Sequence, residues 1–275
     1  MRKRILFRSL SMTSKLIIAN VAVFILALIL SIFVKNSLDF LALKPSDFVR
    51  GINLWTVVTS MFMHAGIMHL FFNMFSLWFV GRFAETIIGR RRLLYFYMIS
   101  GIFAGIVFAL LSGLFGTGIG EKIFGNLDIA GVGASGAIFG LIGLIAVLTP
   151  KNRVYLIAGP LIAIVLQATA EAIFPDNVVL TLLSLVVTIY IFISIFSLFS
   201  FNQRTMKIAL PLEMQFWLLP IIAIVPLVII GLFVPLPIGN TAHFGGLIAG
   251  IVYGLYLRNK CRKKIKLLNH YLIRQ

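Results

Sequence analysis

Few side chains of this chain could do chemistry in apolar surroundings, and most of those are histidines. His64, His69 and His243 lie at the ends of apolar stretches, whereas His270 lies in a basic tail. On a helix, His69 and Asn73 are four positions apart, so they project from one face, one turn apart. This spacing predicts a pair of hydrogen-bond donors. His64 lies earlier and is expected at the helix entrance, pointing elsewhere.

A serine supplies a possible nucleophile. Ser135 lies in the turn Gly133-Ala134-Ser135-Gly136, where another apolar stretch begins. The glycines allow backbone to close around its hydroxyl, and its amide is among the unpaired donors of a first helical turn. A hydroxyl, an imidazole to take its proton and donors for an oxyanion are the parts of an acyl-transfer site. Because the acidic residues lie in loops or near segment ends, the sequence predicts a dyad of Ser135 and His243, without a carboxylate.

Apolar helices must position these residues. Hydrophobic residues make up 60% of the 275 residues and charged residues only 12%, against about 45–50% and about 25% in soluble domains. At roughly 20 residues per crossing, this composition leaves no room for a separate soluble domain. The fold class expected is all-α, a polytopic transmembrane bundle of about eight helices. The apolar stretches are Leu16 to Val34, Val57 to Val80, Leu93 to Phe115, Ala134 to Leu148, Val154 to Phe174, Val178 to Phe201, Phe216 to Val234 and Thr241 to Leu257.

The distribution of Lys and Arg sets the expected orientation, since cytoplasmic loops of membrane proteins are enriched in these residues. With a cytoplasmic N-terminus, every Lys and Arg falls on the cytoplasmic side except Lys35, Lys44, Arg50 and Lys122. This bias favours an even number of crossings, with both termini in the cytoplasm and the predicted site at the outer face. The net charge of +16 is then explained by the membrane topology, because the cations lie in short clusters between apolar stretches. Nucleic acid is therefore not an expected partner.

Glycines on two of the stretches indicate close helix contact. The serine stretch carries Gly136 and Gly140, and the histidine stretch carries Gly246, Gly250 and Gly254. Small residues at such spacings let two membrane helices approach closely. Holding a histidine against a serine requires such an approach.

Three motifs occur in order along the chain: His64-Ala-Gly-Ile-Met-His69-Leu-Phe-Phe-Asn73, Gly133-Ala134-Ser135-Gly136 and Ala242-His243-Phe-Gly-Gly246-Leu-Ile-Ala-Gly250. Together they resemble the rhomboid family of intramembrane serine proteases. Gly81 and Glu85 also resemble a turn of that family. The resemblance covers roughly Trp55 to Pro150 and Gly239 to Leu257.

The resemblance implies a role for each matched residue. Ser135 would be the nucleophile and His243 the base, while His69, Asn73 and the Ser135 amide would form the oxyanion hole. Phe139 would be the aromatic residue that stacks on the histidine. His64 would be structural and would tie down the first outer loop.

Two features depart from the family pattern. Trp55 is followed by Thr56, where the family often has Trp-Arg in the first outer loop. In addition, the six-helix core of the family has one helix between the serine and histidine helices, whereas this chain has three apolar stretches there. We expect one membrane domain over residues 1–275, with a core at 16–150 and 211–258, an inserted helical pair at 154–201 and a basic cytoplasmic tail at 258–275. Phe216 to Val234, or else one of the other two stretches between the serine and the histidine, would then be the helix beside which substrate enters.

The resulting expectation is a serine endopeptidase that cleaves transmembrane segments of membrane proteins near the outer face, in a prokaryotic plasma membrane. The family resemblance implies small residues at the cut and helix-breaking residues beyond it. Its partners would be transmembrane protein substrates and the lipid bilayer, and no metal or cofactor is implied. Oligomeric state is left open. The alternative is an inactive rhomboid-like chaperone or adaptor that binds transmembrane helices without cutting them.

Other functional classes lack their usual residues. The zinc-protease motif His-Glu-x-x-His does not occur, and all four aspartates lie in loops, which argues against an aspartyl protease. A proton-coupled transporter would be expected to have carboxylates near the midplane, and the central stretches have none. The single cysteine, Cys261, cannot form an internal disulfide or a thiolate cluster.

Overall fold

The computed structural model describes residues 10–174, 177–198, 203–231 and 239–273. Within these residues the protein is helical apart from one short two-stranded sheet. Each of the eight predicted stretches contains a helix, which confirms the all-α transmembrane bundle. The predicted cytoplasmic cations Arg2, Lys3, Arg4 and Arg8, and the predicted helix ends Phe201 and Val234, lie outside the described residues.

Four of the described helical segments are long and apolar enough to cross a membrane. They are α2 (Met12–Phe33), the continuous run through α5 (Ile67–Ser76), a π-helical turn (Leu77–Gly81) and α6 (Arg82–Ile88), α7 (Arg90–Phe115), and α11 (Val178–Leu198) up to Ser197. Shorter apolar helices lie in α9 (Ser135–Leu148), in α10 (Ala158–Ile173) and in the turn η4 (Phe216–Leu218) with α13 (Leu219–Gly231). The chain is therefore a multi-pass membrane protein.

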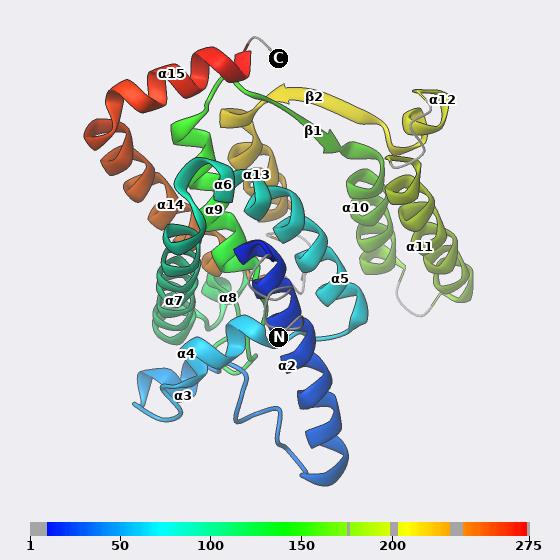
Figure 1. Cartoon of the computed structure of the whole chain (residues 1–275). Coiled ribbons are helices and arrows are strands. Elements are labelled where there is room, and N and C mark those ends of the chain that lie inside the picture. Colours follow the sequence, from blue (N-terminus) through cyan, green and yellow to red (C-terminus); the bar gives the residue numbers. More distant parts are fainter. Residues whose placement is uncertain (1–9, 175–176, 199–202, 232–238, 274–275) are drawn as a thin grey trace, which may run out of the picture.

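The serine helix α9 lies at the centre of the bundle. It packs against α7 and against α14 (Asn240–Lys260), and Figure 1 shows these three helices side by side. Leu141, Leu144 and Ile145 of α9 are fully buried in the main hydrophobic cluster. Because α9 is covered by other helices of the chain, its first residue, Ser135, has a fixed position within the bundle.

The predicted helix from Val57 to Val80 is interrupted. The chain forms the short helices α4 (Thr56–Thr59) and η1 (Ser60–Phe62), then runs in a non-helical segment to Gly66, and α5 begins at Ile67. Gly66 has φ and ψ near 175°, an extended backbone that cannot continue a helix. As a result His64 precedes the helix that carries His69.

The loop between α2 and α4 is anchored, although Trp55 is followed by Thr56. This loop contains α3 (Pro45–Val49), which packs on α7. The Trp55 indole donates to the Phe40 carbonyl at 2.9 Å, and the Thr59 hydroxyl donates to the Leu41 carbonyl at 2.8 Å. A backbone bridge joins Leu43 to Gly131 in the loop that leads to Ser135, just after α8 (Ile119–Phe124). The loop that follows α2 and the loop that leads to Ser135 are thus joined through their backbones.

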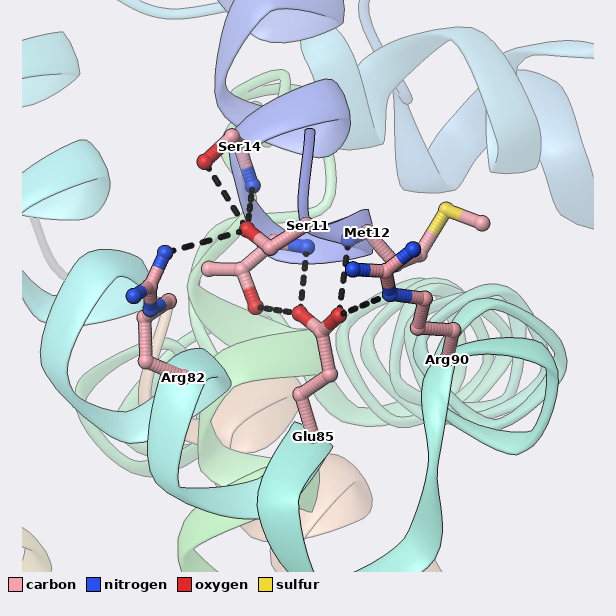
Figure 2. A network of polar contacts seen from close by, with 7 residues as sticks. Ser11, Met12, Ser14, Arg82, Glu85 and Arg90 are labelled. Carbon is pink, nitrogen blue, oxygen red and sulfur yellow. Dashed lines mark hydrogen bonds and ion pairs between the residues drawn. The ribbon is translucent and has the colours of Figure 1, made fainter. Parts of the chain in front are cut away.

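Glu85 joins two helices at the opposite end of the bundle (Figure 2). Its carboxylate accepts hydrogen bonds from the backbone amides of Met12 and Thr13 at 2.9 Å and from the Thr13 hydroxyl at 2.7 Å. Arg90 lies 3.4 Å from the same carboxylate. A carboxylate at a helix start satisfies amides that have no partner within the helix and interacts favourably with the helix dipole. Glu85 therefore fixes the start of α2 against α6.

The segment between α9 and α13 differs from the prediction at its ends. Residues 153–157 form strand β1 (Arg153–Ile157), not the start of a helix, and pair antiparallel with β2 (Pro211–Gln215). The strands are joined by an ion pair of 2.7 Å between Arg153 and Glu213. Between them lie α10, α11, α12 (Gln203–Met206) and the turn η3 (Lys207–Ala209). Figure 1 shows α10 and α11 beside α5, where the rings of Phe192 and Phe71 lie 5.8 Å apart.

The basic tail is also structured. After α14 ends at Lys260, residues Arg262–Ile273 form helix α15. Figure 1 shows α15 lying across the end of the bundle where α6 and the β1–β2 ribbon are found.

Candidate active site

Two helices bring a serine and a histidine into contact. The Ser135 hydroxyl oxygen lies 2.9 Å from His243 Nε2. Ser135 is the first residue of α9, and His243 lies in the first turns of α14. The imidazole is buried, with 8% of its surface exposed, and the serine is partly buried. A hydroxyl and an imidazole nitrogen at this separation can share a proton.

Glycines allow the close approach of α9 and α14. A Cβ added to Gly246 would overlap the carbonyl oxygen of Gly136, and one added to Gly250 would overlap that of Gly140. The two backbones therefore touch directly, about one turn and two turns beyond His243 on α14. A larger residue at either position of α14 would push the histidine helix away from the serine helix.

The orientation of the His243 ring is set by Phe139 on one face and by Ser135 at its edge. Phe139, one turn along α9, stacks on the imidazole with a centroid distance of 4.3 Å and an interplanar angle of 14°. Nδ1 is buried and has no hydrogen-bond partner among the described residues. If Nε2 accepts from the serine, the ring proton of the neutral imidazole is on Nδ1. Within the described chain no carboxylate bonds to this nitrogen.

His69 faces the same backbone as the serine. Its Nδ1 accepts from the Ala65 amide at 3.3 Å, so in the neutral ring Nε2 carries the proton and is a donor. A Cβ placed on Gly133 would lie 3.1 Å from His69 Nε2 and 3.7 Å from Ser135 Oγ. Gly133 has φ +129°, which side-chain-bearing residues rarely adopt. The glycine thus lets the backbone before Ser135 pass directly beneath His69.

Asn73 lies one turn after His69 on α5 and is buried. One hydrogen of its amide nitrogen is used in a 2.9 Å bond to the His69 carbonyl of its own helix. The nitrogen has a second hydrogen, so Asn73 can still donate to another group. The amide oxygen is buried and has no partner within the described structure.

His64 lies beside this group without joining it. Its ring centroid is 5.2 Å from that of His69, with the rings edge to face, and 6.5 Å from that of Phe24 on α2. Its two ring nitrogens are buried and have no hydrogen-bond partner among the described residues. His270, on α15, is exposed at the far end of the bundle.

The sequence analysis missed a contact that fixes the start of α14. The Thr241 hydroxyl, two residues before His243, donates to the Phe124 carbonyl of α8 at 3.2 Å. The Ser112 hydroxyl of α7 donates to the same carbonyl. Three elements therefore meet at Phe124. A threonine near the histidine is a weak signal, because neither its acceptor nor the position of α8 can be read from the spacing.

Metal-binding side chains do not gather in the described parts of the chain. No group of three or more His, Cys, Asp or Glu residues there could hold a metal ion. The chemistry that the site can perform comes from the hydroxyl, the imidazole and the neighbouring hydrogen-bond donors.

Comparison with known proteins adds a family match. The family model described as Rhomboid domain matches residues 52–190, which include Ser135, His69 and Asn73 and end before His243. The putative rhomboid protease YdcA of Bacillus subtilis (strain 168) is 38% identical over 105 residues, covering 36% of this chain and 46% of the relative. RHOMBOID-like protein 1 of Arabidopsis thaliana is 41% identical over 102 residues, covering 37% and 23%.

A third relative has a different description. The inactive RHOMBOID-like protein 8 of Arabidopsis thaliana is 34% identical over 99 residues, covering 36% of this chain and 24% of the relative. In each of these three comparisons the chain spans less than half the length of the relative.

Proposed function

The chain belongs to the rhomboid family, and from this premise we propose that it is a serine endopeptidase that hydrolyses peptide bonds in transmembrane segments of other membrane proteins. The observation that carries the proposal is the 2.9 Å contact between Ser135 Oγ and His243 Nε2. These atoms come from separate helices of a membrane bundle, and glycine contacts hold the two backbones together. Such a contact is the ground-state arrangement of a serine activated by a base.

The dyad would act through an acyl-enzyme. Ser135 Oγ attacks the scissile carbonyl carbon while His243 Nε2 takes the hydroxyl proton, and the imidazolium then protonates the leaving amine. Water attacks the resulting ester with His243 again as base, which releases the carboxylic acid and restores the serine. General-base help of this kind contributes roughly 10²- to 10⁴-fold in rate.

The oxyanion formed in both steps needs hydrogen-bond donors. The Ser135 amide lies in the first turn of α9, where it has no partner within the helix. His69 Nε2–H faces the backbone at Gly133, next to the serine. The second amide hydrogen of Asn73 is available one turn further along α5. We assign these three donors to the oxyanion hole.

The substrate must expose its backbone to reach this site. An intact helix keeps its carbonyls hydrogen-bonded, so a transmembrane substrate would have to unwind locally before attack. Small residues at the cut and helix-breaking residues beyond it would favour such unwinding. The site would lie towards the outer face, with both termini of the protein in the cytoplasm and the chain in a prokaryotic plasma membrane.

The test is cleavage of a labelled single-span substrate by the purified protein. The native protein should yield a fragment, whereas Ser135→Ala and His243→Ala should not. Matched controls are Ser31→Ala, at an exposed position of α2, and His270→Ala, on α15; both should cleave normally. Cleavage by both dyad variants at the native rate would reject the dyad. A serine-directed fluorophosphonate should label Ser135, and the labelling should be lost in His243→Ala.

An adaptor without protease activity is the second candidate, because one similar protein is described as inactive. The same experiment separates the two functions. If the native protein binds the substrate stably, does not cut it and is not labelled by the fluorophosphonate, it is an adaptor.

A further inference from the structure

The last helix, α15, begins where the last helix of the bundle ends. Cys261 leaves the helical conformation, with φ −114° and ψ 31°, and separates α14 from α15. Figure 1 shows that α15 does not continue along α14 but lies across the end of the bundle. The final turn of α14 carries Arg258 and Lys260. Since cations at the end of an apolar bundle mark the edge of the hydrocarbon layer, α15 lies at the level of the lipid headgroups.

The inner side of α15 is tied to the serine helix. Asn269 donates from Nδ2 to the carbonyl of Leu148, the last residue of α9, at 2.8 Å. Ile265 packs against the main hydrophobic cluster. The carbonyls of a last helical turn have no partner within the helix, so Asn269 satisfies one that α9 leaves open. The far end of the helix that begins at Ser135 therefore depends on α15.

The side of α15 that faces away from the helix bundle, called its outer side below, is strongly positive. Arg262, Lys263, Lys264 and Lys266 are exposed, and no acidic residue follows Glu213 in the sequence. Of the ion pairs among the described residues, none involves α15. Leu267, in the middle of the same outer side, has 71% of its surface exposed. The helix thus has cations on this side and Ile265 on the opposite side, and such a division is typical of a helix that lies in a membrane interface.

The negative charge of anionic phospholipid headgroups is complementary to the exposed cations on this side of α15. A cluster of Lys and Arg next to a membrane-spanning helix is attracted to such lipids, and a leucine beside it can enter the acyl boundary. We propose that α15 is an interfacial helix whose outer side binds anionic phospholipid headgroups and whose inner side thereby holds the end of α9 through Asn269. The inference is independent of protease activity.

Thermal unfolding of the full chain in mixed micelles tests the proposal. Phosphatidylglycerol should raise the unfolding temperature more than phosphatidylcholine does, because a ligand bound only by the folded state stabilises it. In Lys263→Gln/Lys266→Gln, the phosphatidylglycerol concentration that gives half of this rise should increase by roughly 30-fold, from the loss of two surface cations. Lys263→Arg/Lys266→Arg keeps the charge and should respond like the native protein.

A matched control removes two exposed cations that lie outside α15 but on the same, predicted cytoplasmic, side of the membrane. Lys151→Gln/Lys207→Gln should keep the native response. An equal loss in this control would show that general surface charge, not α15, attracts the lipid. Equal effects of phosphatidylglycerol and phosphatidylcholine would also overturn the proposal. Soluble glycerol phosphate should have no effect, and a rise equal to that caused by the lipid would reject a membrane source.

A separate variant tests the contact between α15 and α9. Asn269→Leu keeps the number and branching of the side-chain heavy atoms but removes the donor to Leu148. The phosphatidylglycerol concentration that gives half of its rise in unfolding temperature should match that of the native protein, while the size of the rise becomes smaller. A rise of native size would separate lipid binding from the serine helix and reject the second half of the proposal.

Discussion

At the scale of single residues, the proposed role of Asn73 depends on the second hydrogen of its side-chain amide. One of its amide hydrogens bonds to its own helix, which fixes the side chain and leaves the other hydrogen for the substrate oxyanion that we propose. Burial keeps water from competing for that hydrogen. A donor fixed before the reaction stabilises the charge as it forms, without reorganisation.

We expect Asn73→Ala to lower kcat by about 10²- to 10³-fold, the usual effect of losing one oxyanion donor. KM should change little, because the charge on the oxygen develops only in the transition state. Steady-state cleavage of a single-span substrate measures both constants. Normal expression and unfolding temperature would exclude a folding defect, and unchanged kinetics would remove Asn73 from the oxyanion hole.

At the scale of elements, the site depends on the contact between α9 and α14. These helices are placed by backbone contacts at Gly136 and Gly246, and at Gly140 and Gly250. Glycine has no side chain to separate them, so dispersion contacts form between the backbones themselves. Helix α8 adds a second constraint on the position of α14, through the hydrogen bond from Thr241 to the Phe124 carbonyl.

Gly246→Ala should separate the serine from the histidine. The new methyl group would overlap the Gly136 carbonyl oxygen, and overpacking of this kind destabilises by about 1–3 kcal/mol. We expect a lower unfolding temperature and much slower fluorophosphonate labelling of Ser135.

Gly239→Ala is the control for this substitution. Among the described residues, a Cβ there would meet only Ala242, at an ordinary distance of 3.6 Å, so stability and labelling should be close to native. If Gly246→Ala also kept native stability and labelling, the close approach of α9 and α14 would not be what positions the dyad.

At the scale of the whole molecule, the orientation of the bundle determines which side of the membrane supplies water and substrate to the site. The outer loops carry few cations and the opposite end carries most of them. This asymmetry predicts that α15 and the start of α7 face the cytoplasm. The dyad, at the first turns of α9 and α14, would then face the other side.

Cysteine labelling in intact cells measures this orientation. Cys261 is the only cysteine, and a membrane-impermeant maleimide should label it only after the membrane is permeabilised. In a Cys261→Ser background, Thr117→Cys in the outer loop should be labelled without permeabilisation. Cys261→Ser alone is the blank. Labelling of Cys261 in sealed cells would invert the proposed orientation.

The sequence alone determined which segments are apolar enough for a membrane and which of their residues are polar. Both follow from residue type and spacing, because transfer from water to lipid is a property of each segment by itself. The same local information placed Ser135, His69, Asn73 and His243 at the ends of helices. It also indicated, through the glycines, which two helices could approach each other closely.

Only the tertiary structure decided how distant segments meet. Residues 153–157 are apolar enough for a helix, and they form a strand because residues 211–215 lie alongside to pair with them. The bonds from Thr241 to Phe124 and from Asn269 to Leu148 join residues far apart in the chain. Periodicity records which face of a helix is apolar, but not which neighbour covers it. That choice depends on the packing of all the helices together.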